Sequence, residues 1–255
     1  MYGWRGRIGL LVPSINTTME TEFWRIAPEG VSVHSARISG GRHGTPEELR
    51  SMEGASKDAA RDVAMVEPDV VVYGCTSGSF FEGPEWNKQI CAQLTEITGA
   101  PTVTTAGSMA ECLLHGGHKK VAVVTPYVEL TNERLKDFLR HYGIKVTHLG
   151  TFDMLDMFDH AKILPEEIYA KVKASDSDEA EALFVACTQL RALEVLDLLE
   201  RDLGKPVYSA VQATAWEAYA AMGVDPQITN CGSLLRGLSE PGALKARRAP
   251  EKKLK

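Results

Sequence analysis

Two cysteines of this chain lie in matching surroundings. Cys75 follows a short apolar run and belongs to the segment Gly74-Cys75-Thr76-Ser77-Gly78-Ser79, and Cys187 follows a similar run 112 residues later. A thiolate is both a nucleophile and a base. A single cysteine in such a place would be assigned to the core, because free cysteines are most often buried. The repeated Cys-Thr context reverses that interpretation and predicts two catalytic thiols, Cys75 and Cys187.

The residues after each cysteine are small or polar. A turn of this kind after a buried strand exposes backbone N–H groups that bind a carboxylate, and the same dipoles should lower the pKa of the Cys75 thiol. We therefore predict that a small carboxylate or dicarboxylate is held between the two turns by Thr76, Ser77, Gly78, Thr188 and Gln189.

Two more polar residues follow apolar runs. Asn16 lies in the loop after residues 8–12, where it either donates its amide to a carboxylate or caps the next helix. Tyr127 follows residues 121–124, where it either hydrogen-bonds the ligand or packs in the core with a solvated hydroxyl. We include both residues in the predicted substrate-binding set.

The remaining candidates form no recognisable site. Cys91 and Cys112 are assigned to helix packing, and Cys231 is left unassigned. The cysteines form no C-x-x-C pair and the histidines no H-E-x-x-H motif, so neither a metal nor a cofactor is predicted. Five arginines are carboxylate-binding candidates that their spacing does not distinguish from solvated ones: Arg5, Arg7, Arg37, Arg42 and Arg191.

Short β-branched runs that alternate with helical patterns must position these residues. Buried strands are predicted at residues 8–12, 70–73, 121–124 and 183–186. Helices are predicted at residues 45–67, 84–98, 108–115, 132–142, 165–174, 192–203 and 213–222. This alternation is typical of an α/β fold in which helices cover both faces of a mostly parallel sheet.

Three landmarks recur in the same order in the two halves of the chain. They are a strand followed by proline (Pro13 and Pro126), a strand ending in Cys-Thr (Cys75 and Cys187), and a Pro-containing segment before a helix (residues 100–103 and 205–208). We expect two similar doubly wound half-domains with parallel sheets, related by a pseudo-twofold axis.

Such an axis would bring the two thiols to opposite sides of one ligand at the carboxyl ends of the strands. The predicted units are residues 1–117, whose last helix could cross over, residues 118–225, and residues 226–255. The last segment is expected to return to the first half and to end in a mobile basic tail.

Composition excludes several classes of protein. The 255 residues carry a formal net charge of -6 without long charged blocks, so no nucleic-acid partner is predicted. No apolar stretch approaches the roughly 20 residues needed to cross a bilayer, so no membrane partner is predicted. The N-terminal residues lack the apolar segment of a signal peptide, and we expect a cytoplasmic protein.

These segments resemble the aspartate/glutamate racemase superfamily, and within it the branch of maleate cis-trans isomerases and arylmalonate decarboxylases. The resemblance covers about residues 5–240, and its most specific part is C-T-S-G-S at residues 75–79 together with the second cysteine. Arylmalonate decarboxylases keep only the later cysteine, so two thiols favour an isomerase or a racemase.

The resemblance implies a cofactor-independent isomerase that converts maleate to fumarate. Cys75 would add to the alkene to give a succinyl-type adduct, and Cys187 would supply and recover the proton. It also implies a homo-oligomer. Maleate isomerases tend to carry a substrate-contacting asparagine where this chain has Met157, which could admit a substrate with one polar arm fewer.

Three alternatives therefore remain open at this point. The first is a two-cysteine racemase or epimerase of an amino-acid-like carboxylate, in which one thiolate abstracts the α-proton and the other thiol delivers a proton from the opposite side. The others are an arylmalonate-type decarboxylase and a non-catalytic carboxylate-binding protein.

Overall fold

The computed structural model describes residues 2–238, which form two four-stranded parallel sheets. The strands of the first sheet, in spatial order, are β2 (Val31–Ile38), β1 (Gly6–Pro13), β3 (Val70–Tyr73) and β4 (Thr102–Thr104). Those of the second are β6 (Lys145–Thr151), β5 (Lys120–Thr125), β7 (Ala182–Val185) and β8 (Val207–Ser209). The two sheets have the same strand order, so the predicted α/β class with two similar halves is confirmed.

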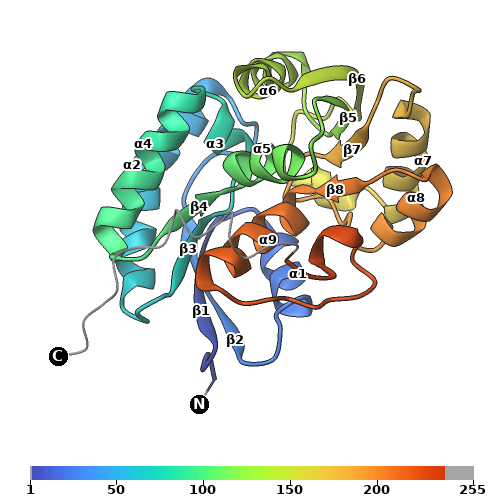
Figure 1. The fold of residues 1–255 in the computed structure, drawn as a ribbon. Coiled ribbons are helices and arrows are strands. Elements are labelled where there is room, and N and C mark those ends of the chain that lie inside the picture. Colours follow the sequence, from blue (N-terminus) through green and yellow to red (C-terminus); the bar gives the residue numbers. More distant parts are fainter. Residues whose placement is uncertain (1, 239–255) are drawn as a thin grey trace.

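Helices cover the sheets and connect the parallel strands (Figure 1). In the first half these are α1 (Met19–Arg25), α2 (Pro46–Ala64), α3 (Thr76–Phe80), α4 (Pro84–Thr98) and α5 (Thr105–His115). In the second half they are α6 (Glu129–His141), α7 (Pro165–Ser175), α8 (Leu196–Leu203) and α9 (Ala210–Met222), with short 3₁₀ turns η1 (Asp159–Lys162) and η2 (Ser233–Leu235).

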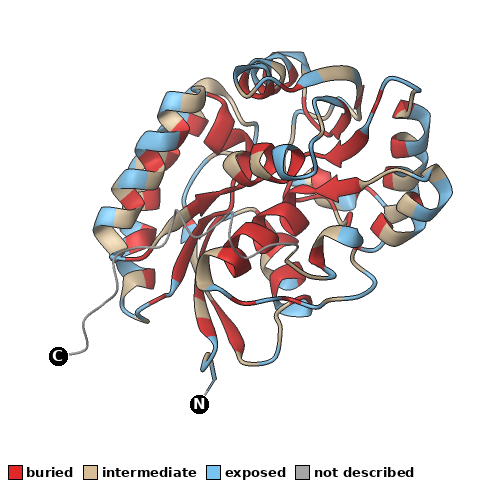
Figure 2. Ribbon diagram, in the orientation of Figure 1, coloured by how far each residue is buried: buried red, intermediate tan, exposed pale blue. Residues whose placement is uncertain are grey.

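Burial follows from the sequence pattern. All four residues of β3 (Val-Val-Val-Tyr) and of β7 (Ala-Leu-Phe-Val) are buried, as expected for central strands covered on both faces. In Figure 2 the strands are mainly red, and the helices are red toward the sheets and blue toward solvent. The core therefore lies on both faces of each sheet.

The edge strands β4 and β8 overlap the two Pro-containing landmarks and were not predicted as strands, and the edge strands β2 and β6 were not predicted at all. Residues of β2 and β6 are partly exposed, and their sequences, Val-Ser-Val-His-Ser-Ala-Arg-Ile and Lys-Val-Thr-His-Leu-Gly-Thr, lack a continuous apolar run. Helix α8 also begins at Leu196, four residues later than predicted, because the chain from residue 192 to 195 makes a turn.

The two halves are tied together by helices α5 and α9, which contact each other in the middle of Figure 1. The Ser108 hydroxyl on α5 donates a 2.7 Å hydrogen bond to the buried carboxylate of Glu217 on α9. The Tyr219 hydroxyl on α9 donates a 2.7 Å bond to the carbonyl of Ile26, at the end of α1. Helix α9 thus links the second half to the first.

The described part of the segment after residue 225 packs against α8 and α9. The Gln212 side chain on α9 donates to the Cys231 carbonyl, and Asp197 on α8 accepts from the Gly232 N–H and from Arg236. The predicted basic tail lies outside the described residues. Within residues 2–238, no helix has the length and apolar character that a membrane span requires.

Glu22 is a buried acid on α1. Burial raises its pKa from 4.5 to about 8, although the positive charge of Arg25 opposes the shift. The folded protein therefore keeps a proton that the unfolded chain loses between these pH values, and the free energy of unfolding falls as pH rises through this window.

Replacing this side chain with a neutral isostere should remove the effect. We expect Glu22→Gln to be more stable than the parent protein by roughly 2 to 5 kcal/mol near pH 8, with the gain shrinking toward pH 5. Denaturant unfolding at several pH values measures this difference. Glu29→Gln, at an exposed position, is the control; a constant gain for Glu22→Gln across the pH range would contradict the account.

Candidate active site

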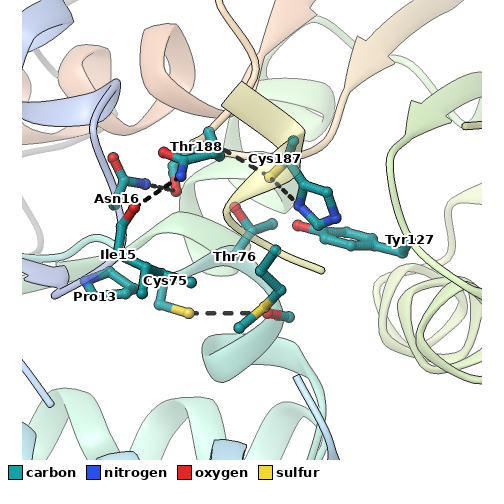
Figure 3. Close-up of a pocket in the computed structure, with 12 residues that line it drawn as sticks. Pro13, Ile15, Asn16, Cys75, Thr76, Tyr127, Cys187 and Thr188 are labelled. Carbon is teal, nitrogen blue, oxygen red and sulfur yellow. Dashed lines mark hydrogen bonds between the residues drawn. The ribbon is translucent and has the colours of Figure 1, made fainter. Parts of the chain in front are cut away.

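A cavity of about 350 Å³, part of it open to solvent, lies where the carboxyl ends of the two sheets meet (Figure 3). Strands β1 and β3 of the first half and β5 and β7 of the second end at this place. The cavity is lined by Pro13, Ile15, Asn16, Cys75, Thr76, Ser77, Tyr127, Met157, His160, Cys187, Thr188 and Gln189. Both predicted catalytic thiols therefore face one cavity, from opposite halves of the chain.

Cys75 lies one residue beyond the end of β3, after Gly74, and caps the short helix α3. Its Sγ accepts a hydrogen bond from the Gly78 N–H at 3.3 Å and lies 3.9 Å from the Ser77 hydroxyl. Burial raises the pKa of the Cys75 thiol, and these two donors only oppose the rise. The predicted lowering of this pKa is therefore wrong. The thiolate loses more free energy of hydration on burial than the two hydrogen bonds give back.

Cys187 follows β7 in the equivalent place. Its Sγ accepts from the Gln189 N–H at 3.4 Å and lies 3.9 Å from Nδ1 of His160. Burial raises the pKa of Cys187 to about 11, and a negative charge on Cys75 acts in the same direction. Hydrogen bonds from the Gln189 N–H and the Tyr127 hydroxyl to the sulfur oppose this rise. The ionisation of Cys187 therefore depends on the charge state of Cys75.

Gln189 and Asn16 join the two halves beside the cavity. The Gln189 side chain donates to the Ile15 carbonyl at 2.9 Å and accepts from the Thr17 N–H at 2.9 Å. The Asn16 amide donates to the Thr188 hydroxyl at 3.1 Å, and its carbonyl accepts from the N–H groups of residues 18 and 19. Asn16 therefore supports the start of α1 and also faces the cavity.

Thr76 and Tyr127 place hydroxyl groups in the cavity. The Thr76 hydroxyl is buried and has no hydrogen-bond partner among residues 2–238 that meets normal geometry. Burial raises the pKa of Tyr127 well above its ordinary value, so the phenol stays protonated and can donate. Gly78 differs from the other predicted residues because it does not line the cavity and acts only through its N–H on Cys75.

His160 is the polar lining residue that was not predicted from the sequence; the other lining residues outside the predicted set are Pro13, Ile15 and Met157. The site residues were predicted from polar side chains that directly follow apolar strands. His160 lies in η1, in a connection between strands, so that criterion did not select it. Met157, from the same connection, also lines the cavity. Its N–H donates to the Arg42 carbonyl at 2.7 Å, and the Arg42 guanidinium forms an ion pair with Asp156 across the two halves.

The lining is electrically neutral. Burial lowers the pKa of His160, and none of the other lining residues among those described is an acid, a lysine or an arginine. Arg42, bound to Asp156, and Arg37, bound to Glu20, lie outside the lining. The described residues include no group of three His, Cys, Asp or Glu side chains placed to hold a metal ion. An anion here must be bound by N–H and O–H donors.

A family model described as arylmalonate decarboxylase matches residues 8–235. The chain belongs to this family. Similar curated proteins include a maleate isomerase of Geobacillus stearothermophilus, 30% identical over 245 residues, which cover 91% of this chain and 97% of that protein. An arylmalonate decarboxylase of Bordetella bronchiseptica is 28% identical over 221 residues, which cover 85% of this chain and 90% of that protein.

Solved structures of maleate isomerases are similar over the same extent. One from Pseudomonas putida S16 with maleate has 31% identity and a TM-score of 0.87, covering 91% of this chain and 98% of that one. A Nocardia farcinica maleate cis-trans isomerase mutant with a covalently bound succinylcysteine intermediate has 28% identity and a TM-score of 0.85, with the same coverage. The predicted branch of the superfamily is thus confirmed.

The Ser77 hydroxyl lies 3.9 Å from the Cys75 sulfur and affects the ionisation of this thiol. Burial raises the pKa of Cys75 and the Ser77 hydroxyl opposes that rise, so Ser77→Ala should raise this pKa further. The rate of iodoacetamide alkylation of Cys75, followed by peptide mass spectrometry against pH, measures it. Ser51→Ala, on the exposed side of α2, should leave the profile unchanged; an unchanged profile for Ser77→Ala would contradict the assigned contact.

Proposed function

We propose that this chain is a cofactor-independent cis-trans isomerase that converts maleate to fumarate, with Cys75 as nucleophile and Cys187 as acid and base. The observation that carries the proposal is the placement of both thiols in one neutral cavity, each at the end of the equivalent strand of its own half. Binding alone would not require two thiols.

The reaction begins with the Cys75 thiolate. Its sulfur lone pair forms a C–S bond to one alkene carbon, and the π electrons move to the neighbouring carbon and into its carboxylate. Cys187 then gives its proton to that carbon, which leaves a succinyl group on Cys75. The former double bond is now a single bond and rotates freely.

The reverse steps release the product. The Cys187 thiolate takes the proton back, the alkene forms again, and the C–S electrons return to Cys75. Oxidation states are the same before and after the cycle, so the chemistry needs no redox cofactor. The enolate-like charge formed during addition must be stabilised by the donors of the cavity.

Hydrogen-bond donors are expected to hold the two carboxylates. Thr76 is suited to this because its buried hydroxyl, near the Tyr127 phenol, makes no hydrogen bond of normal geometry within residues 2–238. We assign the same role to the Asn16 amide, the Tyr127 phenol and the N–H groups of the two Cys-Thr turns, which include Ser77, Gly78, Thr188 and Gln189. The maleate isomerases among the similar proteins support this choice of substrate.

A racemase or epimerase of an amino-acid-like carboxylate is the second candidate. It is favoured by Met157, an apolar side chain in the cavity lining that offers no hydrogen bond to a second carboxylate. In that reaction the same two thiols would exchange a proton on opposite faces of one carbon. Decarboxylation and simple carboxylate binding rank lower, because neither requires the second thiol.

The organisation of the protein is part of the proposal. We infer two copies of one unit, residues 1–117 and 118–225, from the shared strand order. We also propose that the enzyme works in the cytoplasm as a homo-oligomer. A reducing compartment suits a mechanism that depends on thiols, and none of the five cysteines, all in the described residues, forms a disulfide bond.

Incubation with maleate and no added cofactor should give fumarate, detected by proton NMR. Cys75→Ser should lower turnover by about a thousandfold or more, because a hydroxyl is a far weaker nucleophile than a thiolate. Cys91→Ser, on α4 and outside the cavity lining, should retain turnover.

Two results would redirect the proposal. Full activity of Cys75→Ser would remove the covalent mechanism. If maleate is unchanged while an amino acid gains deuterium at its α-carbon in heavy water, the racemase replaces the isomerase.

A further inference from the structure

His160 contacts Cys187 on the side of the imidazole that can accept a proton. The ring is buried, with 2% of its surface exposed. Its Nε2 lies 3.1 Å from the Met154 carbonyl and its Nδ1 lies 3.9 Å from the Cys187 sulfur. Cys187 and Tyr127 are labelled in Figure 3, and a dashed line from the Cys187 sulfur marks its contact with Nδ1.

The Met154 contact decides which nitrogen carries the proton. A carbonyl oxygen only accepts hydrogen bonds, so Nε2 must hold the N–H in the neutral ring. Nδ1 then has a free lone pair directed at Cys187. The thiol is the donor in this contact, and the imidazole is the acceptor.

We propose that His160 is the proton acceptor of Cys187 and makes this cysteine a base near neutral pH. The S–H bond breaks with its electron pair left on sulfur, and the proton binds the Nδ1 lone pair. The product is a thiolate beside an imidazolium whose two N–H groups face the sulfur and the Met154 carbonyl. No net charge enters or leaves the cavity, so the transfer avoids the full cost of forming a buried thiolate alone.

The groups around His160 are compatible with a transient imidazolium. Asp156 and Asp159 lie on the same connection and their negative charges favour protonation of the ring, while burial opposes it. The Tyr127 ring packs edge-on at 6.0 Å between centroids, and its phenol interacts with Cys187. Cys75 is the other titratable group that acts on Cys187.

The role in catalysis rests on the proposed isomerase function. In the elimination step the proton on the succinyl carbon returns to the Cys187 sulfur, and Nδ1 of neutral His160 can accept it from there, so that the Cys187–His160 pair holds the returned proton. His160 is thus a positioning residue that acts through Cys187. The same pair would serve proton abstraction in a racemase.

The pH dependence of Cys187 alkylation by iodoacetamide tests the pair without any substrate. In the unmodified protein the rate should be nearly independent of pH between about pH 7 and pH 9, because transfer within the pair does not exchange protons with solvent. In His160→Gln, which keeps an N–H donor for Met154 but lacks a basic nitrogen, the rate should fall about tenfold for each pH unit below about pH 10.

Controls separate this effect from a structural one. His118→Gln removes a histidine that contacts the Tyr208 hydroxyl at 3.1 Å and lies outside the cavity lining, so the Cys187 profile should not change. Thermal melting checks that each variant is folded, and His160→Asn is a second variant without a basic nitrogen. Equal pH profiles for the parent and a folded His160 variant would overturn the proposal.

Nitrogen NMR of the histidine rings is a second readout that needs no reagent to reach the sulfur. At about pH 8, His160 should carry its proton on Nε2, and Cys187→Ser should change the pKa of the ring. A proton on Nδ1 of the neutral ring, or an unchanged pKa in Cys187→Ser, would also overturn the proposal. Neither readout uses maleate. A negative result in these experiments would therefore contradict the Cys187–His160 pair without bearing on the proposed isomerase function.

Discussion

The hydrogen bonds between the end of β1 and the end of β7 fix the relation between the two halves at the cavity. Gln189 bonds to the backbone on both sides of Asn16, and Asn16 bonds to Thr188. Thr188 in turn donates to the Gly74 carbonyl, next to Cys75, at 3.3 Å. The residues beside the two sulfur atoms are therefore connected to each other directly, and a shift of one half would separate the thiols.

A second constraint is the neutrality of the cavity. Buried sulfur atoms without a full positive charge nearby keep their protons, as the raised pKa values of Cys75 and Cys187 indicate. A dianionic substrate that enters the cavity therefore encounters hydrogen-bond donors and no negatively charged side chain. The cost is that each thiol needs help to ionise: the Gly78 N–H and Ser77 hydroxyl assist Cys75, and His160 assists Cys187 in the mechanism proposed above.

The sequence was sufficient to predict the central strands and most of the polar residues that line the cavity. The runs that become β1, β3, β5 and β7 are continuous and apolar, and the repeated Cys-Thr pair marked the ends of two of them. Eight of the nine predicted site residues line the cavity, and Gly78 contacts Cys75 from outside it.

What could not be predicted depends on tertiary contacts. Strands β2 and β6 are edge strands with mixed polarity, so periodicity does not distinguish them. His160 reaches the cavity through the path of a connection, which no local spacing encodes. The direction of the Cys75 pKa was wrong because the residue types indicate hydrogen-bond donors but not the depth of burial that outweighs them.

The claim that two thiols serve one small molecule is tested most directly by mass spectrometry of the Cys187→Ser protein after incubation with maleate. In this variant Cys75 should still add to maleate, with the carbon taking its proton from water, and the adduct should persist because no thiolate removes that proton. The peptide that contains Cys75 should then gain the mass of one maleic acid. An adduct on Cys91, Cys112 or Cys231 in its place, or no adduct while the parent protein still forms fumarate, would contradict the account.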